Sequence, residues 1–286
     1  MRASNEFSRY RAVGGARGIE ALHAQFMMHR FAPHVHDSWA IGGVLEGVKD
    51  NGPSATSSNV VRKGELTILP PGHVHAGKAV GNRPYQYVMI YVSDDLMQAR
   101  ARHCGFARVQ FSSSAIPAAE IVVRLASFVR ATLNLPLSDQ SSQEVVAACE
   151  ALLEALIVRH GHLTPPGGDP PPASAEAGLS RARRFLLEHW DQPISLDHLA
   201  REAALSPYYF CRQFGRLYGL TPHRYQQVLR LARARNLIIR GASVTEAAAA
   251  TGFADQSHLG RQFRSCYGYS PGSLILEKPS IAVTAQ

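Results

Sequence analysis

The sequence predicts a two-domain α+β protein, with a cupin-like β-barrel and helices in its N-terminal part and an all-α domain in its C-terminal part. Short β-type segments separated by turn residues fill residues 20–92, a pattern typical of a small antiparallel barrel or jelly roll. A stretch rich in proline and glycine then divides the chain at 163–178. After it, one segment of the sequence occurs twice, which indicates a supersecondary unit used two times. We therefore expect domains at 1–162 and 179–286, joined by a linker at 163–178.

The composition is that of a globular protein. The 286 residues are 45% hydrophobic and 18% charged, which allows each domain a core of its own and excludes general disorder. The four cysteines are scattered without a CxxC pair, as expected for reduced thiols in a cytosolic protein. The polar N-terminus and the lack of an apolar run of about 18 residues predict neither a signal peptide nor a transmembrane helix. We therefore expect a cytoplasmic protein.

Within the first domain, strands are expected at Trp39–Val48, Glu65–Leu69 and Tyr85–Val92, because turn sequences such as DNGPS and VGNRP separate these apolar segments. Helical periodicity follows at 117–135 and 140–160. The second of these segments carries four apolar residues at 4-3-4 spacing, which places them on one helix face. They are Val145, Cys149, Leu152 and Leu156. This face packs either on its own domain or against a partner helix in a dimer, and the spacing alone does not separate the two.

Positive charge is concentrated after the linker. The five prolines of 163–178 predict a semi-stiff, solvated linker. Of the formal net charge of +8, residues 179–286 account for 14 Lys/Arg against 7 Asp/Glu. The preceding 178 residues carry 16 against 15. This asymmetry suits a phosphate-binding surface, although a basic surface kept for solubility would also produce it.

The repeated segment predicts two helix-turn-helix units. The stretch Phe210–Pro222 returns 49 residues later as Leu259–Pro271. Six identical pairs connect the copies: Arg212, Gln213, Phe214, Tyr218, Gly219 and Pro222 match Arg261, Gln262, Phe263, Tyr267, Gly268 and Pro271. The two matched phenylalanines are expected to anchor the second helix of each unit, and this helix would enter a major groove of DNA.

Capping residues define the helices of each copy. In the first copy, helices are expected at 196–203 after Ser195 and at 207–218 after Ser206 and Pro207. In the second copy, a capping box of Ser243 and Glu246 opens a helix at 244–250.

A turn at 251–254, in which Gly252 adopts a left-handed conformation, then leads to Asp255 as the cap of a helix at 256–267. At the shared spacing, Ala200 corresponds to Ala249, and both are small enough for two crossing helices. An arginine-rich helix at 222–240, about 28 Å long, joins the copies and would set the recognition helices about one DNA turn, roughly 34 Å, apart.

On these residues, Leu179–Ile275 resembles the tandem helix-turn-helix domain of AraC/XylS-type transcriptional regulators. The signature is VTEAAAATGFADQSHLGRQFRSCYGYSP; after Pro271 it has Leu274-Ile275 where the family usually has Tyr-Arg. The resemblance implies base contacts from one set of residues in each copy, Pro207, Tyr208, Cys211 and Arg212 in the first and Gln256, Ser257, His258 and Arg261 in the second. Arginine pairs with guanine and glutamine with adenine, so these residue types suit base recognition.

The barrel segment carries two further motifs. His34-Val-His36, and Gly64 through Pro70 and Gly72 to His75, resemble the two motifs of cupin barrels, although the first lacks its glutamate. In AraC-type regulators such a barrel is an effector pocket, usually without metal. The resemblance therefore implies a small-molecule ligand and no metal or cofactor. A three-histidine metal site and purely structural histidines remain as alternatives. The effector-binding candidates are His34, His36, Trp39 and His75, with Tyr87 and Glu46 as further candidates.

Together these features predict a transcriptional activator controlled by an effector, acting on promoter DNA as a homodimer together with RNA polymerase. A metal-dependent cupin enzyme with an added DNA-binding module is one alternative, and an architectural DNA-binding protein is another. The sequence contains neither a nucleophile–base arrangement nor a phosphate loop, and we therefore expect no enzyme activity.

Overall fold

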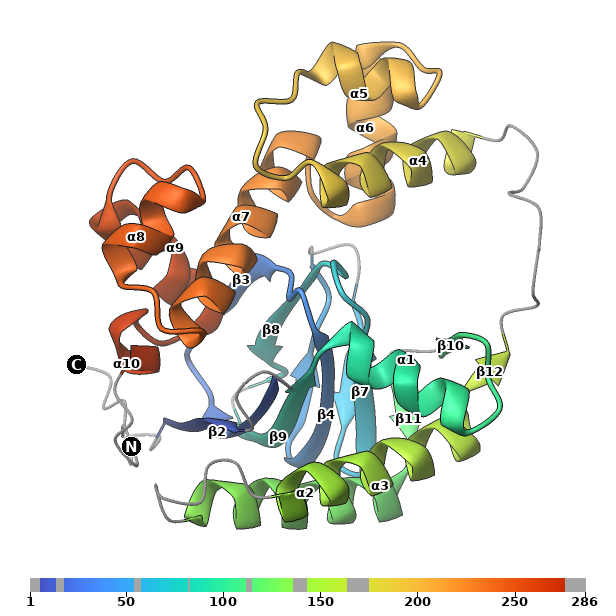
Figure 1. Cartoon of the computed structure of the whole chain (residues 1–286), viewed down its shortest axis with the longest axis vertical. Coiled ribbons are helices and arrows are strands. Elements are labelled where there is room, and N and C mark those ends of the chain that lie inside the picture. The colour runs from blue at the N-terminus through green and yellow to red at the C-terminus, as the bar shows by residue number, and fades with distance from the viewer. Residues whose placement is uncertain are drawn as a thin grey trace.

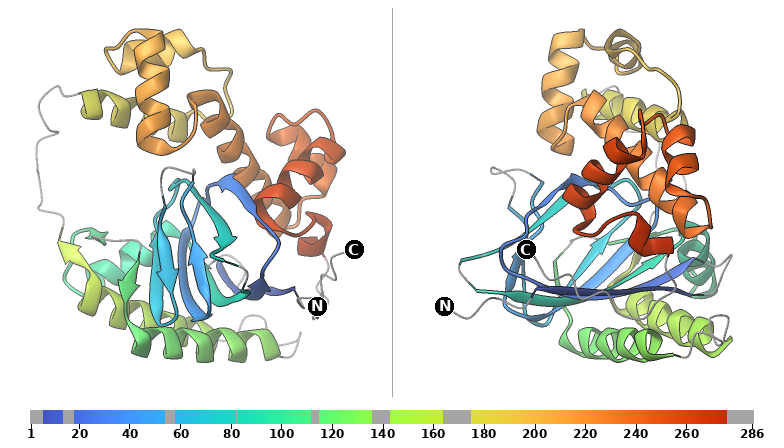
Figure 2. Two further views of the ribbon diagram at one scale, coloured as in Figure 1. Left: turned by 180° about the vertical axis from the view of Figure 1, so that it is seen from behind. Right: turned by 90° about the vertical axis from the view of Figure 1, so that its left-hand side faces the viewer.

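The computed structural model of the chain describes residues 6–13, 18–53, 58–81, 83–111, 115–135, 143–163 and 175–275. A β-sheet domain occupies the middle of the molecule, two long helices lie beneath it, and a helical domain lies above it (Figure 1). The views in Figure 2 show the helical domain lying over one end of the sheet domain. None of the described helices is long and apolar enough to cross a membrane.

The N-terminal domain is built from antiparallel strands in two main sheets. The larger sheet has the order β1-β2-β9-β4-β7-β11, the smaller has the order β3-β8-β5-β6, and β10 pairs with β12. The strands are β1 (Phe7–Val13), β2 (Ile19–Phe26), β3 (Phe31–His34), β4 (Trp39–Glu46), β5 (Val48–Asp50), β6 (Val60–Arg62), β7 (Glu65–Leu69), β8 (His75–Ala79), β9 (Tyr85–Val92), β10 (Val109–Gln110), β11 (Ile116–Pro117) and β12 (His162–Leu163). The predicted barrel-type domain is therefore present.

The central strand β9 is apolar apart from Gln86, because both of its faces are largely buried. Side chains alternate between the two faces of a strand. Val88, Ile90 and Val92 lie in the core between the sheet and the helices beneath it. Tyr87 and Tyr91 point to the opposite face, into a second cluster inside the barrel. One face of the sheet thus holds the helices, and the other lines the interior where a ligand cavity forms.

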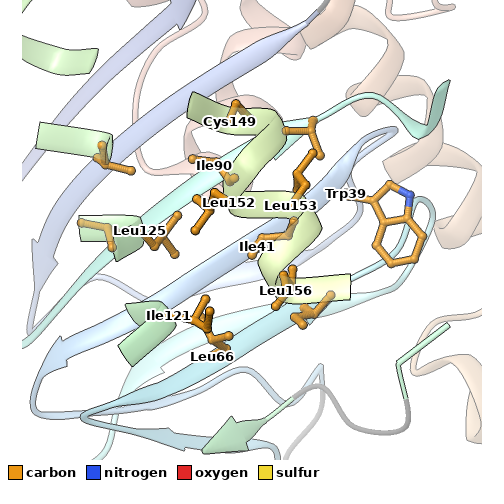
Figure 3. Packing of buried hydrophobic residues seen from close by; sticks show 14 of the residues in the cluster. Trp39, Ile41, Leu66, Ile90, Ile121, Leu125, Cys149, Leu152, Leu153 and Leu156 are labelled. Atoms are coloured by element: carbon orange, nitrogen blue, oxygen red, sulfur yellow. The ribbon is translucent and has the colours of Figure 1, made fainter. Parts of the chain in front are cut away.

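The described part of this domain also contains the helices α1 (Asp94–His103), α2 (Ala119–Asn134) and α3 (Gln143–His160). All four residues at 4-3-4 spacing on α3 are buried. Figure 3 shows Cys149, Leu152 and Leu156 on the same side of α3, packed with Ile41 and Leu125. The face that sequence spacing left open between two partners therefore packs on its own domain.

In the described range 175–275 the regular elements of the C-terminal domain are all helices. They are α4 (Ala175–Glu188), α5 (Leu196–Glu202), α6 (Pro207–Tyr218), α7 (Pro222–Ile239), α8 (Val244–Ala250), α9 (Gln256–Tyr267) and α10 (Gly272–Ile275). The pairs α5–α6 and α8–α9 are the two helix-turn-helix units, and α7 runs between them (Figure 1). Phe214 and Phe263 are fully buried, as expected for anchors.

Most predicted caps are present as hydrogen bonds. Ser195 accepts from the amide of His198, and Asp255 accepts from the amide of His258 at 2.6 Å. Ser243 and Glu246 form the expected capping box. Ser206 occupies the N-cap position of α6, but its side chain makes no capping hydrogen bond, so Pro207 at the first helical position is the stronger start signal there.

The predicted match of Ala200 with Ala249 is wrong by one residue. Ala200 and Ala248 are both buried, whereas Ala249 is exposed. The carbonyls of Ala200 and Ala248 accept equivalent turn hydrogen bonds, from Leu205 and Phe253. The second turn contains one extra residue, so the spacing between copies is 48 before the turn and 49 after it.

Both turns nevertheless require the same backbone conformation. Ala204 has a φ of 56° and Gly252 a φ of 76°. Glycine adopts this left-handed conformation without a steric cost, whereas the alanine is strained there.

The linker predicted at 163–178 ends earlier in the structure than the sequence predicts. Helix α4 already begins at Ala175, because the sequence Ala-Glu-Ala favours a helix and Ala177 is buried. Gly178 lies so close to the carbonyl oxygen of Ala203 that a Cβ atom would come within 2.2 Å of it. At the other end Leu163 belongs to β12, and residues 164–174 lie outside the described part of the chain.

Candidate functional site

The base-contacting candidates lie on the N-terminal halves of α6 and α9. Pro207, Tyr208 and Arg212 are exposed on α6, and Cys211 is half-buried there. Tyr208 is 78% exposed, which is unusual for a large aromatic side chain that contacts no binding partner. The N-terminal half of α6 thus presents an exposed surface of mixed aromatic and cationic character.

Helix α9 presents the equivalent surface of the second unit. Gln256, Ser257 and Arg261 are exposed, and His258 is half-buried. The ring of His258 packs edge-on against Phe253 at 5.4 Å between centroids. The described structure therefore leaves most predicted base-contacting side chains accessible, with His258 and Cys211 the least so.

A second candidate site is a cavity between the two domains. It measures about 30 Å³ and lies inside the barrel, beneath α9. The barrel and the helical domain both line it: Leu22, Phe31, His34, His36, Lys49, His75, Ala76, Tyr87, Met89 and Tyr91 come from the first, and Cys266, Tyr267 and Tyr269 from the second.

Three of the predicted ligand-binding residues meet in this cavity. His34 at the end of β3 lies directly opposite His75 at the start of β8 in the strand register, and His36 follows in the next loop. The ring centroids are 4.3 Å apart for His34 and His75 and 5.1 Å apart for each of the other two pairs. All three side chains are buried.

Burial keeps these imidazoles neutral. Loss of water around the ring lowers the pKa of His34 to about 4, although a hydrogen bond to the backbone opposes the shift. Burial, followed by the nearby His34, lowers the pKa of His36 and of His75 well below the ordinary value. The three rings therefore offer lone pairs rather than positive charge at neutral pH.

Trp39, the fourth predicted member, does not belong to this cavity. Its indole Nε1 donates to Asp94 Oδ1 at 2.7 Å, and its ring packs against Phe111 in the core beneath the sheet. Figure 3 shows it among the core residues. Of the further candidates, Tyr87 lines the cavity, while Glu46 is exposed at the end of β4.

An ion pair that the sequence did not suggest connects the two domains. Arg235 of α7 is buried and pairs with Glu20 of β2, with Nη1 donating to Oε1 at 3.2 Å and Nη2 donating to Oε2. The guanidinium lies 5.1–5.6 Å from the ring centroids of Tyr10, Tyr91 and Tyr267. Burial works against the charge of Arg235, but Glu20, Tyr269 and Tyr10 together outweigh it and raise the pKa of the arginine well above its usual value.

Further contacts fix the helical domain on the barrel. The hydroxyl of Tyr225 donates to the carbonyl of Gly72 at 2.7 Å. Gly72 leaves room for the helical domain, since a Cβ atom there would lie 2.9 Å from Leu187 and 3.3 Å from the hydroxyl oxygen of Tyr225. Asp37 accepts from the amide group of Asn236 at 2.6 Å and pairs with Arg233 at 3.5 Å.

Comparisons with known proteins match both domains. Residues 199–275 match the model of a helix-turn-helix domain, and residues 17–157 match that of an AraC-like ligand binding domain. The chain belongs to the AraC family of transcriptional regulators. This is a family of DNA-binding regulators with a ligand-binding domain, and it is not enzymatic.

Individual relatives agree with the family assignment. This AraC-family chain is 26% identical over 247 residues to the uncharacterised regulator YbfI of Bacillus subtilis, covering 84% of this chain and 86% of that protein. It is 37% identical over 99 residues to the transcriptional activator RhaS of Escherichia fergusonii, covering 34% of this chain and 36% of RhaS. A crystal structure of apo ToxT from Vibrio cholerae shares the fold, with a TM-score of 0.56 and 10% identity over 95% of this chain and 97% of that one.

The contact between the two domains of this AraC-family chain was not predicted from the sequence. The arginines of α7 are expected from the sequence to form a basic joining helix, yet Arg235 is buried against the barrel and Arg233 pairs with Asp37. No spacing along the chain signals such pairs, because Glu20 and Arg235 are 215 residues apart. The one available signal was Glu20 itself, a charged residue that lies between the apolar residues Ile19 and Ala21 near the start of β2.

Proposed function

We propose that this regulator binds specific promoter sequences through α6 and α9 and activates transcription in response to a ligand held in the cavity between its domains. The single observation that carries the proposal is the composition of the cavity wall. Tyr267 ends the second recognition helix and Tyr269 follows it. Both line the same cavity as the barrel histidines. A ligand there would touch the DNA-binding domain directly.

The DNA contacts would come from the exposed N-terminal halves of the recognition helices. In the first unit these are Pro207, Tyr208, Cys211 and Arg212; in the second they are Gln256, Ser257, His258 and Arg261. Arginine and glutamine are the side chains best suited to hydrogen bonds with guanine and adenine in the major groove. The positive charge of the C-terminal domain would supply sequence-independent attraction to phosphates.

Regulation follows from the domain contact. A ligand shifts an equilibrium between two arrangements only if it binds them with different affinity. Sites for small organic ligands usually measure roughly 300–1,000 Å³, whereas this cavity measures about 30 Å³. A metabolite-sized effector would therefore have to displace Tyr267 and Tyr269, whereas an ion-sized ligand would fit beneath them.

A homodimer would place two such chains on one promoter. The inner face of α3 is used within the domain, so a partner would contact the outer faces of α2 and α3. Val123 of α2 is 65% exposed and Val158 of α3 is 67% exposed. Activation further implies contact with RNA polymerase, as the resemblance to activators of this family suggests.

The test begins with selection of operator sequences from random duplex DNA by the full-length chain. We expect one enriched motif whose two contacted segments are about one helical turn apart, and in vitro transcription from it that changes when a stabilising ligand is added. Equal binding of selected and unselected DNA would contradict the proposed specificity. If every ligand that raises the melting temperature leaves transcription unchanged, the cavity is not the regulatory site.

A further inference from the structure

The three buried histidines of the cavity form a compact donor set. One ring nitrogen from each of His34, His36 and His75 lies within 4.8 Å of the corresponding atoms of the other two. The strand register places His34 opposite His75, and antiparallel pairing holds both rings on the same side of the sheet. The arrangement is therefore built by the barrel itself and does not depend on a mobile side chain at the surface.

Hydrogen bonds to the backbone define which nitrogens are available. Nδ1 of His34 lies 2.8 Å from the carbonyl oxygen of Ala32, and Nδ1 of His75 lies 3.2 Å from that of His73. A carbonyl only accepts, so both Nδ1 atoms carry the proton and both Nε2 atoms carry a lone pair. Ligating histidines in metal sites are held in the same way, with the second ring nitrogen donating to a carbonyl or carboxylate.

His36 lacks such a partner. Its Nδ1 is buried without a hydrogen bond to any described residue, and its ring centroid lies 4.7 Å from that of Tyr91 and 5.1 Å from those of His34 and His75. Leaving a buried polar atom unsatisfied is costly. A set of neutral imidazoles with unused lone pairs around one small space lacks an electron-pair acceptor, and a cation would supply it.

The size and the wall of the cavity narrow the choice of ligand. A volume of about 30 Å³ holds an ion with one or two water molecules, since a water needs roughly 10–15 Å³ by this measure. The described residues that line it include no carboxylate, which disfavours Mg²⁺ and Ca²⁺ because these ions prefer oxygen ligands. Imidazole nitrogen suits the ions of the later transition series.

We propose that His34, His36 and His75 bind one divalent transition-metal ion of the Zn²⁺, Ni²⁺ or Co²⁺ class. The inference rests on the proposed function in one respect, because it names the ligand class of the same cavity. Three histidines leave a fourth position for water or a small anion. Lys49 lines the cavity next to them, and a small anion on the ion would offset part of the combined positive charge of the ion and Lys49.

The DNA-binding domain covers this site. The ring centroid of Tyr267 lies 5.2 Å from that of His34 and 5.6 Å from that of His36. Its hydroxyl donates to the carbonyl of Val35 at 3.3 Å, in the segment between the two histidines. The ion would therefore lie beneath the end of the second recognition helix, where occupancy and domain contact influence each other.

The test measures metal binding by the full-length chain in the absence of DNA. Protein stripped with a chelator is titrated with Co²⁺ and followed by its visible absorption, and bound Zn²⁺ is counted by mass spectrometry after dialysis. We expect one ion per chain. His36→Gln and His75→Gln should each weaken binding by at least about 100-fold, since second-shell changes alone cost 10–100-fold. The matched control is His103→Gln, because this residue lies on α1 with its side chain 65% exposed.

Binding of much less than one ion per chain, or equal binding by the wild type and by folded His36→Gln and His75→Gln variants, overturns the inference. If the variants do not fold, paramagnetic resonance of wild-type chain loaded with Cu²⁺ decides the question. Couplings to several imidazole nitrogens support the site, and a spectrum of oxygen ligands alone excludes it. Since no DNA is present, loss of the metal result leaves the proposed DNA-binding function untouched, and failed operator selection leaves the metal result untouched.

Discussion

Arg212 and Arg261 occupy equivalent positions on the two recognition helices, and both side chains are exposed. Replacing either with alanine should weaken operator binding by about 1–3 kcal/mol and relax specificity at one base position, because a bidentate contact with guanine is lost. Electrophoretic mobility shifts on a panel of single-base operator variants would measure both effects. The charge-matched control is Arg124→Ala on α2, whose side chain is 57% exposed far from the recognition helices.

The pattern of loss distinguishes two kinds of contact. Loss of a base contact lowers the affinity for operators with the preferred base and changes the affinity for the other operator variants little. Uniform weakening on all operator variants, with a smaller dependence of affinity on salt, would instead assign the arginine to a phosphate.

Trp39 illustrates how a site residue is wrongly predicted from its position in the chain. It follows His36 closely, yet side chains alternate along β4, and Trp39 and Ile41 point into the core beneath the sheet, while Ala40 points into the barrel. A shift of one residue exchanges the two faces. The clustering of the three histidines was predictable because two cupin-like motifs carry them, even though the first lacks its glutamate, whereas the face of Trp39 depends on where β4 begins.

This assignment makes a prediction for Trp39→Phe. The substitution removes the 2.7 Å hydrogen bond to Asp94 and some core packing, and should lower the free energy of unfolding by about 1–3 kcal/mol. Urea unfolding would measure this loss, and Co²⁺ titration of the folded variant should match the wild type. A stable variant that no longer binds the ligand of the cavity would show that Trp39 is a ligand-binding residue after all.

At the scale of elements, the three serines at N-cap positions differ in whether their side chains make a capping hydrogen bond. Ser195 and Ser243 accept hydrogen bonds from helix amides, whereas the side chain of Ser206 accepts none. Substitution by alanine should therefore cost about 0.5–2 kcal/mol at Ser195 and at Ser243, and close to nothing at Ser206. Thermal unfolding of the three variants would test this order, and an equal loss at Ser206 would contradict it.

The helices were more predictable than the strands because caps of this kind are local in the sequence. Helix ends carry local signals, and the ranges expected for α6, α8 and α9 agree with the structure. Strand pairing is not local. β1 carries two arginines, Arg9 and Arg11, and lies before the segment in which strands were expected. It became a strand by pairing along its whole length with β2, and tertiary context of this kind outweighs intrinsic propensity.

At the scale of the whole molecule, the docked arrangement depends on charge buried between the domains. Glu20 and Arg235 are 8% and 3% exposed, and α7 carries Arg235 between the two DNA-binding units (Figure 1). Removing one partner of a buried pair costs about 3–5 kcal/mol, because the other charge stays buried and unpaired. The helical domain can avoid this cost by leaving the barrel, since the guanidinium then reaches water.

Glu20→Gln should therefore release the DNA-binding domain. We expect a larger radius of gyration in small-angle scattering than for the wild type. Operator affinity should also no longer respond to the cavity's ligand, with Zn²⁺ as the first probe; a coupling of about 5–150-fold is typical where two sites communicate. The matched control is Glu120→Gln, which breaks surface pairs with Arg124 and Arg159 on the far side of the sheet domain and should change neither quantity. A Glu20→Gln protein that stays compact and keeps its ligand response would show that the apolar contacts, rather than the ion pair, hold the domains together.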